Sequence, residues 1–287
     1  MKDDSRFVQS LRFTSFLSVA IGASMCAQAQ SFSYPDFSST AGLQLNGSAA
    51  QVGNVLELTP ASLSQSGSAF STTQIALQNQ ASFSTAFTFK MPNVGGIGDG
   101  DGTGADGIVF ALQTVASNVG GAGGGIGYAG INHSLGVEFD TYNNGGADND
   151  GNHVALDFNG ALNDTSLTHV SDRMNNGAVW HAWVDYNGLT SDLQVRLSET
   201  STRPSAPTID YVVPGGLESI LGQSSAYVGF TAGTGAGFEN QDILSWQFNN
   251  NFQPIETVAD TASSLLLLGI AVSGLVAFER RFRKIND

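Results

Sequence analysis

One stretch, LGVEFDTYNNGGADNDGNHVALDFN, constrains the fold most, because two runs with a two-residue period flank a loop of Asn, Gly and Asp. In the first run, apolar residues alternate with Glu138, Asp140 and Tyr142. The period of a β-strand therefore puts both carboxylates and the tyrosine on one face. In the second run, His153 and Asp157 share a face in the same way. The stretch predicts two neighbouring strands joined by a polar loop.

The chemistry of these side chains indicates a cation site. The loop is rich in carboxylate and amide oxygens, which suit calcium. A carboxylate set that includes one imidazole suits manganese or zinc. The alternative is that the acidic residues merely solvate a loop. Two carboxylates on one strand face beside a histidine favour the metal site.

The charge of the chain excludes one class of partner. Its formal net charge is −14. Few basic residues lie between Gln30 and Ala259, namely Lys90, Arg173, Arg196 and Arg203. Such an acidic chain repels phosphate backbones, so nucleic acid is not an expected partner. Cys26 is the single cysteine, which leaves no intrachain disulfide.

Residues 1–29 are expected to form a secretory signal peptide. Basic residues precede an apolar stretch from Phe13 to Met25, and the small residues of Ala27-Gln28-Ala29 suit cleavage. Cys26 is expected to leave with this peptide. Lipidation of Cys26 is the alternative, but the bulky Met25 just before it disfavours that reading.

Residues 254–287 are expected to be a membrane-directed segment. The apolar run from Thr261 to Phe278 is at the short limit for a transmembrane helix. The basic residues that follow it should stay on the cytoplasmic side. A buried core helix is the alternative, which the terminal position and the flanking charges disfavour.

The sequence of this segment, VADTASSLLLLGIAVSGLVAFERRFRK, resembles PEP-CTERM sorting signals, most closely the VPDSG variety. The resemblance implies a Gram-negative bacterium, an exosortase-type protease as partner, and at least transient anchoring in the inner membrane. The product would be secreted or held in the cell envelope or extracellular matrix. Ala259 stands where the family has proline, so cleavage is less strongly implied than recognition.

The body of the chain, residues 30–253, is predicted to be all-β. Short runs with strand character are separated by loops of Gly, Ser and Asn, with one helical turn expected near residues 217–221. The expected strands include residues 83–89, 108–112, 179–186, 193–197, 227–231 and 242–248. Many strands without an internal repeat favour a sandwich over a propeller.

This body resembles a legume-type (L-type) lectin domain, which implies a concanavalin-like jelly roll. Six pieces occur in the order of the family: FSTAFTF, ADGIVFALQ, GGGIGY, VEFDTYNN, HVALDFN and VGFTAGTGAGFENQDILSWQF. The resemblance implies a carbohydrate-binding protein that depends on calcium and manganese and is not an enzyme.

The resemblance also implies a set of metal ligands. The manganese-type site would take Glu138, Asp140, Asp148 and His153. The calcium site would share Asp140 and Asp148, and it would add the carbonyl of Tyr142 and the side chain of Asn144. Asp148 fits the family's spacing to the histidine, and Asp150 is the alternative.

The sugar-binding residues implied by the family surround a cis peptide, which maps to Ala105–Asp106. Asp106 would accept hydrogen bonds from two sugar hydroxyls, and Tyr142 could stack on the ring. The other implied contacts come from the Asn144 amide and from the backbone of Gly124, Ala236 and Gly237. The compact loop from Gly235 to Glu239 hints at glycans of the mannose/glucose type, and oligomers are possible.

Two other functions stay open from the sequence. Laminarinase-type hydrolases share this fold and carry E-x-D-x-x-E on one strand. Glu138 and Asp140 match the first two positions, but Asn143 replaces the acid that must protonate the leaving group. A structural or adhesive matrix protein that has lost sugar binding is the second alternative.

Overall fold

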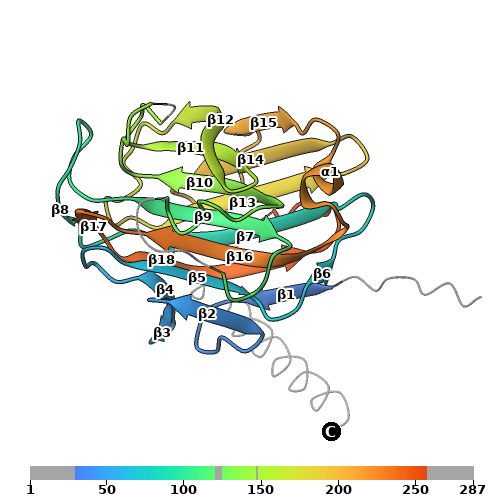
Figure 1. Cartoon of the computed structure of the whole chain (residues 1–287), viewed down its shortest axis with the longest axis horizontal. Coiled ribbons are helices and arrows are strands. Elements are labelled where there is room, and N and C mark those ends of the chain that lie inside the picture. The colour runs from blue at the N-terminus through green and yellow to red at the C-terminus, as the bar shows by residue number, and fades with distance from the viewer. Residues whose placement is uncertain (1–29, 120–124, 147, 257–287) are drawn as a thin grey trace, which may run out of the picture.

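The computed structural model describes residues 30–119, 125–146 and 148–256. Two antiparallel sheets stack face to face and form a β-sandwich, as Figure 1 shows. The predicted all-β sandwich is thereby confirmed. Within the described part of the chain, no helix is long and apolar enough to cross a bilayer. The expected signal peptide and the apolar run from Thr261 to Phe278 lie outside the described residues.

One sheet, here called the back sheet, has eight strands. Its order is β15 (Ile209–Val212), β14 (Asp192–Ser198), β13 (Trp180–Asn187), β7 (Phe83–Lys90), β18 (Gln241–Asn249), β4 (Val55–Thr59) and β3 (Ala50–Val52), with β1 (Ser31–Tyr34) also paired to β18.

The other sheet, here called the front sheet, also has eight strands. Its order is β12 (Ala161–His169), β11 (His153–Phe158), β10 (Ser134–Asp140), β9 (Gly107–Gln113), β16 (Ser225–Gly233), β5 (Ser66–Ser71) and β2 (Leu43–Gly47), with β6 (Ile75–Ala76) also paired to β16. A short ribbon of β8 (Gly95–Gly96) and β17 (Gly237–Phe238) lies at one edge, and the helical turn α1 (Leu217–Leu221) precedes β16. All strands expected from the sequence, and the helical turn, are therefore present.

Aromatic side chains fill the space between the two sheets. The ring of Phe230 on the front sheet lies 4.9 Å from that of Phe87 and 4.8 Å from that of Trp246, both on the back sheet. Both contacts are edge-to-face, a favourable geometry for aromatic pairs. All three side chains are completely buried.

A second, smaller apolar cluster covers the outer face of the front sheet. Ile126, Tyr128 and Ile131 from the loop before β10 pack there against Val109 and Ala111 of β9. As a result, β9 and β10 are buried on both faces. Polar side chains on the outer face of β10 therefore lie beneath a loop rather than in open solvent, and this placement shapes the site.

Candidate functional site

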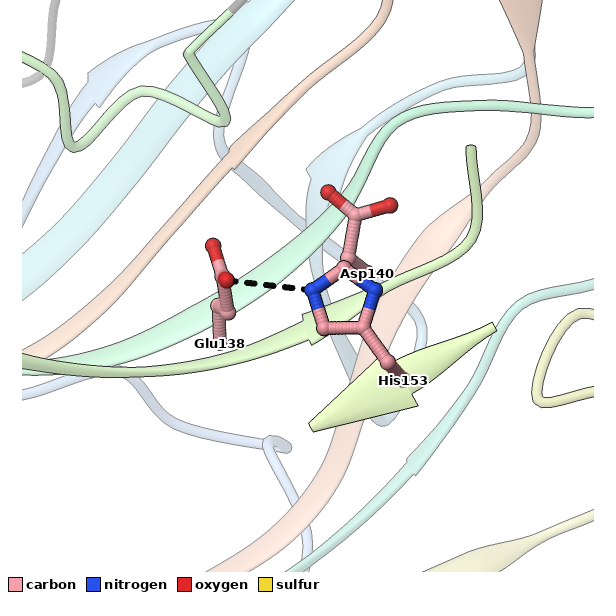
Figure 2. Close-up of side chains that lie close together, drawn as sticks. All are labelled: Glu138, Asp140 and His153. Atoms are coloured by element: carbon pink, nitrogen blue, oxygen red, sulfur yellow. Dashed lines mark hydrogen bonds and ion pairs between the residues drawn. The ribbon is translucent and has the colours of Figure 1, made fainter. Parts of the chain in front are cut away.

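Strands β10 and β11 bring the predicted acidic residues and the histidine together. In their register, Asp140 pairs with His153 and Glu138 pairs with Ala155. Since side chains alternate along a strand, Glu138, Asp140 and His153 all emerge on the outer face. Their ligand atoms lie within 4.8 Å of one another, and Figure 2 shows the three side chains converging.

Two contacts orient the ring of His153. Its Nδ1 atom lies 2.7 Å from the carbonyl oxygen of Asp150, which can only accept a hydrogen bond, so Nδ1 carries a proton. Its Nε2 atom lies 3.2 Å from Oε1 of Glu138. In the neutral ring, Nε2 therefore keeps its lone pair directed at a carboxylate. A proton or a cation between these two acceptors removes their repulsion.

The loop after β10 adds Asp148 to this group. Oδ2 of Asp148 accepts the backbone N–H of Asn144 at 2.7 Å, and Nδ1 of His153 lies 3.9 Å from Oδ1. Asp150 instead directs its Oδ2 to Nδ1 of His169, 2.7 Å away. The geometry therefore places Asp148, and not Asp150, beside the other three side chains.

Burial dominates the electrostatics of the cluster. Loss of hydration raises the pKa of Asp140 well above its usual value, and the nearby Glu138 and Asp148 carboxylates raise it further. Burial likewise raises the pKa of Glu138 and of Asp148. The charged form of these carboxylates is therefore unfavourable unless positive charge reaches the cluster.

The residues present fit divalent cations. Among the described residues, no lysine or arginine forms an ion pair with Glu138, Asp140 or Asp148. Oδ1 of Asp148 is also buried without a hydrogen-bond donor there. Buried carboxylates are normally paired or bound to metal. The three carboxylates line a cavity of about 270 Å³ together with Gly125, Ile126, Asn144, Gly145, Leu162 and Asp164.

Asp106 immediately precedes β9, next to the end of β10. The peptide Ala105–Asp106 is cis, as the resemblance implied. The backbone of Asp106 is fixed on both sides, since its N–H donates to Gly233 and its carbonyl accepts from Thr141. Burial, followed by the charge of Asp148, raises the pKa of its carboxyl to about 6. Its Oδ2 atom is buried without a donor among the described residues.

A turn from β16 to β17 lies over this segment. Ala236 is exposed, and its carbonyl accepts the N–H of Ile97. Gly237 is buried, and a Cβ at this position would lie 2.8 Å from that of Ala105. A larger residue at 237 would therefore push the turn away from the cis peptide. The two residues expected to offer backbone amides at the rim of a sugar site thus differ in exposure.

The other residues predicted to contact the sugar differ in their exposure. Asn144 is exposed, and its Nδ2 atom lies 3.4 Å from the carbonyl oxygen of Tyr142. The Tyr142 residue is half-buried, and its backbone N–H donates to Oδ1 of Asp140 at 2.6 Å. Gly124 lies outside the described residues, although Gly125 beside it lines the cavity.

Sequence reasoning missed Glu239, which is completely buried behind the site. Its carboxylate accepts hydrogen bonds from Thr141 at 2.8 Å and from Asn175 at 2.7 Å. Burial raises its pKa to about 7. Glu239 thus ties the segment after β17 to the end of β10. No local pattern in the sequence signals a contact between residues so far apart.

The comparisons with known proteins decide the family. The sequence model of the legume lectin domain matches residues 29–264, which is most of the chain. The chain belongs to the legume lectin domain family. The predicted concanavalin-like fold and carbohydrate-binding class are confirmed at this level.

Individual relatives of this legume lectin domain are plant proteins. Lectin DB58 of Vigna unguiculata subsp. cylindrica is 31% identical, over 84% of this chain and 90% of its own. Bark agglutinin I polypeptide B of Robinia pseudoacacia is 32% identical, over 65% of this chain and 64% of its own. The L-type lectin-domain containing receptor kinase VIII.1 of Arabidopsis thaliana is 30% identical over 70% of this chain. The chain spans only 27% of that kinase and just under two thirds of the bark agglutinin.

Solved structures of lectins superpose on the same domain. Lectin II from Ulex europaeus has a TM-score of 0.61 at 29% identity, covering 76% of this chain and 97% of that one. A basic winged bean lectin with Tn-antigen has a TM-score of 0.63 at 27% identity, covering 77% and 98%. The matched family binds carbohydrate without catalysing a reaction, which agrees with the expectation that this domain is not an enzyme.

Proposed function

We propose that this legume lectin domain binds glycans in a calcium- and manganese-dependent manner. The observation that carries the proposal is the convergence of Glu138, Asp140, Asp148 and His153 beside the cis peptide Ala105–Asp106. Divalent cations would supply the positive charge that this buried group lacks. Manganese would be held by these four side chains, and calcium by Asp140, Asp148, the Tyr142 carbonyl and Asn144.

The sugar would bind where Asp106, Asn144 and the turn at Ala236–Gly237 come together. Oδ2 of Asp106 has no donor within the described ranges, and a sugar hydroxyl can provide one. Asn144 and Ala236 are exposed, so their amides can reach a ligand. Gly124 would contribute its backbone N–H, and the ring of Tyr142 would pack on the sugar.

Two classes of sugar are candidate ligands, the mannose/glucose type and the galactose type. The compact turn before Glu239 favours the mannose/glucose type. Among the structural relatives, one lectin was solved with galactose and one with Tn-antigen, which favours galactose-type ligands. A glycan array probed with the metal-loaded protein distinguishes the two classes of sugar. Asp106→Ala serves as the control for binding at this site.

One observation favours a second function, a matrix or adhesive protein that keeps the fold without binding sugar. Asp106 is only 5% exposed, so a hydroxyl has a narrow approach to its carboxylate. The same array separates the two functions. Binding to a defined glycan class supports the lectin, whereas no binding in calcium and manganese supports the matrix role.

We also propose that the domain is exported. The support is the secretory pattern of residues 1–29 and the apolar run followed by basic residues in the segment 254–287. A Gram-negative cell envelope or extracellular matrix would be the destination, reached through exosortase-type sorting at the inner membrane. Fractionation of cells that express the full chain tests this proposal, and the protein should appear outside the cytoplasm.

A further inference from the structure

Asp164 on β12 faces the same cluster, although the metal ligands proposed above do not include it. Its carboxylate lies within 4.8 Å of ligand atoms of both Asp148 and His153, and it forms a second such group with Glu138 and Asp157. It also lines the cavity that Glu138, Asp140 and Asp148 line. We propose that Asp164 is a further protein ligand of the cation held by Glu138 and His153. The inference rests on the metal dependence proposed above.

An irregularity in the β11–β12 pair aims Asp164 at the cluster. The register shifts twice along this pair, between Val154 and Leu156 and between Leu156 and Phe158. Asp164 itself has a φ of +49°, in the left-handed region. Irregularities of this kind redirect side chains near functional sites. A regular strand would not turn the backbone in this way at residue 164.

Buried Asp157 holds this irregular backbone in place. Its Oδ1 atom accepts the N–H of Asn163 at 2.8 Å and that of Asp164 at 3.3 Å. Asp157 is completely buried, and its other oxygen, Oδ2, has no donor among the described residues. The Asp157 carboxylate belongs to the group formed with Glu138 and Asp164. Asp157 is therefore a positioning residue for Asp164, because it holds the backbone from which the Asp164 side chain projects.

The charge at this place points to a cation rather than to a solvated acid. Oδ2 of Asp164 and Oδ1 of Asp148 are both buried without a donor in the described part of the chain. Neither residue has a lysine or arginine partner there. A fourth carboxylate beside Glu138, Asp140 and Asp148 raises the electrostatic cost of the cluster unless it contacts bound positive charge.

The extra carboxylate predicts a stronger and more oxygen-rich site. With Asp164, the cation would meet four carboxylates and one imidazole. Such a set suits Mn²⁺, which accepts carboxylate oxygens and an octahedral shell, better than Zn²⁺, which favours four-coordinate nitrogen and sulfur sites. Replacement of the Asp164 carboxylate should admit another water molecule to bound Mn²⁺.

The test compares the full chain with Asp164→Asn in Mn²⁺ titrations by calorimetry and by water proton relaxation. Asn keeps the shape of the side chain and tolerates a positive φ. We expect Mn²⁺ affinity to fall at least about tenfold and the relaxation enhancement per bound Mn²⁺ to rise, with a smaller change for Ca²⁺. Asp172→Asn, which removes an exposed charge from the loop after β12, should leave both readouts unchanged.

Two outcomes separate this inference from the proposed function. Equal affinity and equal relaxation in wild type and Asp164→Asn overturn the role of Asp164 alone. Failure of the wild type to bind Mn²⁺ at all overturns the metal dependence itself. If the Asn variant does not fold, Asp164→Gly removes the carboxylate at a backbone conformation that glycine readily adopts, and the same readouts apply.

Discussion

The backbone N–H of Asn144 donates to Oδ2 of Asp148 at 2.7 Å. This bond joins an exposed residue proposed to contact sugar to a carboxylate proposed to contact both cations. Asp148 also acts electrostatically on Asp106, whose pKa it helps to raise. A change of charge at Asp148 should therefore alter both Asn144 and Asp106, which are proposed to contact the sugar.

Neutralisation of Asp148 is expected to weaken metal binding far more than neutralisation of Asp150. Asp148→Asn removes a carboxylate from the cluster, whereas Asp150→Asn alters the contact with the exposed His169. Metal content after dialysis, measured by mass spectrometry, checks the difference. Equal metal content in the two variants would contradict the assignment of Asp148.

Substitution of Asp106 is expected to abolish sugar binding without preventing metal binding. Asp106→Ala removes the acceptor of two proposed charged hydrogen bonds, each worth about 1.5–3 kcal/mol, so affinity should drop about a hundredfold or more. Asp101→Ala, an exposed acid in the preceding loop, is the control. Calorimetry with a glycan identified on the array gives both affinities. An unchanged affinity in Asp106→Ala would place the sugar elsewhere.

Removal of divalent cations is expected to destabilise the domain more at pH above 7 than near pH 5. Burial raises the pKa of Glu138, Asp140 and Asp148 above their unfolded values. Between the unfolded and the raised folded-state pKa values of these carboxylates, the metal-free fold binds more protons than the unfolded chain. Its free energy of unfolding therefore falls as pH rises between those values. Melting curves with and without a chelator check the effect. A chelator effect of equal size at both pH values would count against it.

Glu239 predicts a second pH dependence that is independent of the metals. Burial raises the pKa of Glu239 to about 7 in the folded protein, so its contribution to stability is present below the unfolded pKa and is lost as pH rises through the folded-state pKa. Glu239→Gln cannot ionise, so its stability relative to wild type should increase between pH 5 and pH 8 by about 2–3 kcal/mol. Urea unfolding in saturating calcium and manganese measures the difference. Parallel pH profiles would show that Glu239 does not titrate as described.

Truncation in the aromatic core is expected to cost much stability. Phe230 is completely buried between Phe87 and Trp246. Phe230→Ala should therefore reduce the free energy of unfolding by about 3–5 kcal/mol. Phe252→Ala, where the ring is 42% exposed, is the matched control and should cost far less. Urea unfolding gives both values, and similar losses would argue against the described core.

The sequence predicts the strands well because their side chains alternate. The runs around Phe87, Phe110 and Phe139 show which residues face the core, and the structure places them there. The same alternation predicts that Glu138 and Asp140 share a face. Neither the second cluster under Ile126 nor the full burial of β10 follows from it, because loop packing depends on contacts across the fold.

The parts of the site that the sequence misses depend on irregular backbone and long-range contacts. Asp157 is visible from its period with His153, but the register shifts that direct Asp164 inward are not. Glu239 reaches Thr141 and Asn175 across large separations in the chain. The family's spacing favours Asp148 and leaves Asp150 as the alternative, whereas the contact of Asp150 with His169 is visible only in the structure.

The most direct test of a metal-dependent glycan site is calorimetric titration of one purified sample before chelation, after chelation, and after calcium and manganese are restored. We predict that binding of the array-selected glycan disappears with the cations and returns with them. Binding that persists at the same affinity after complete removal of both metals would contradict the account.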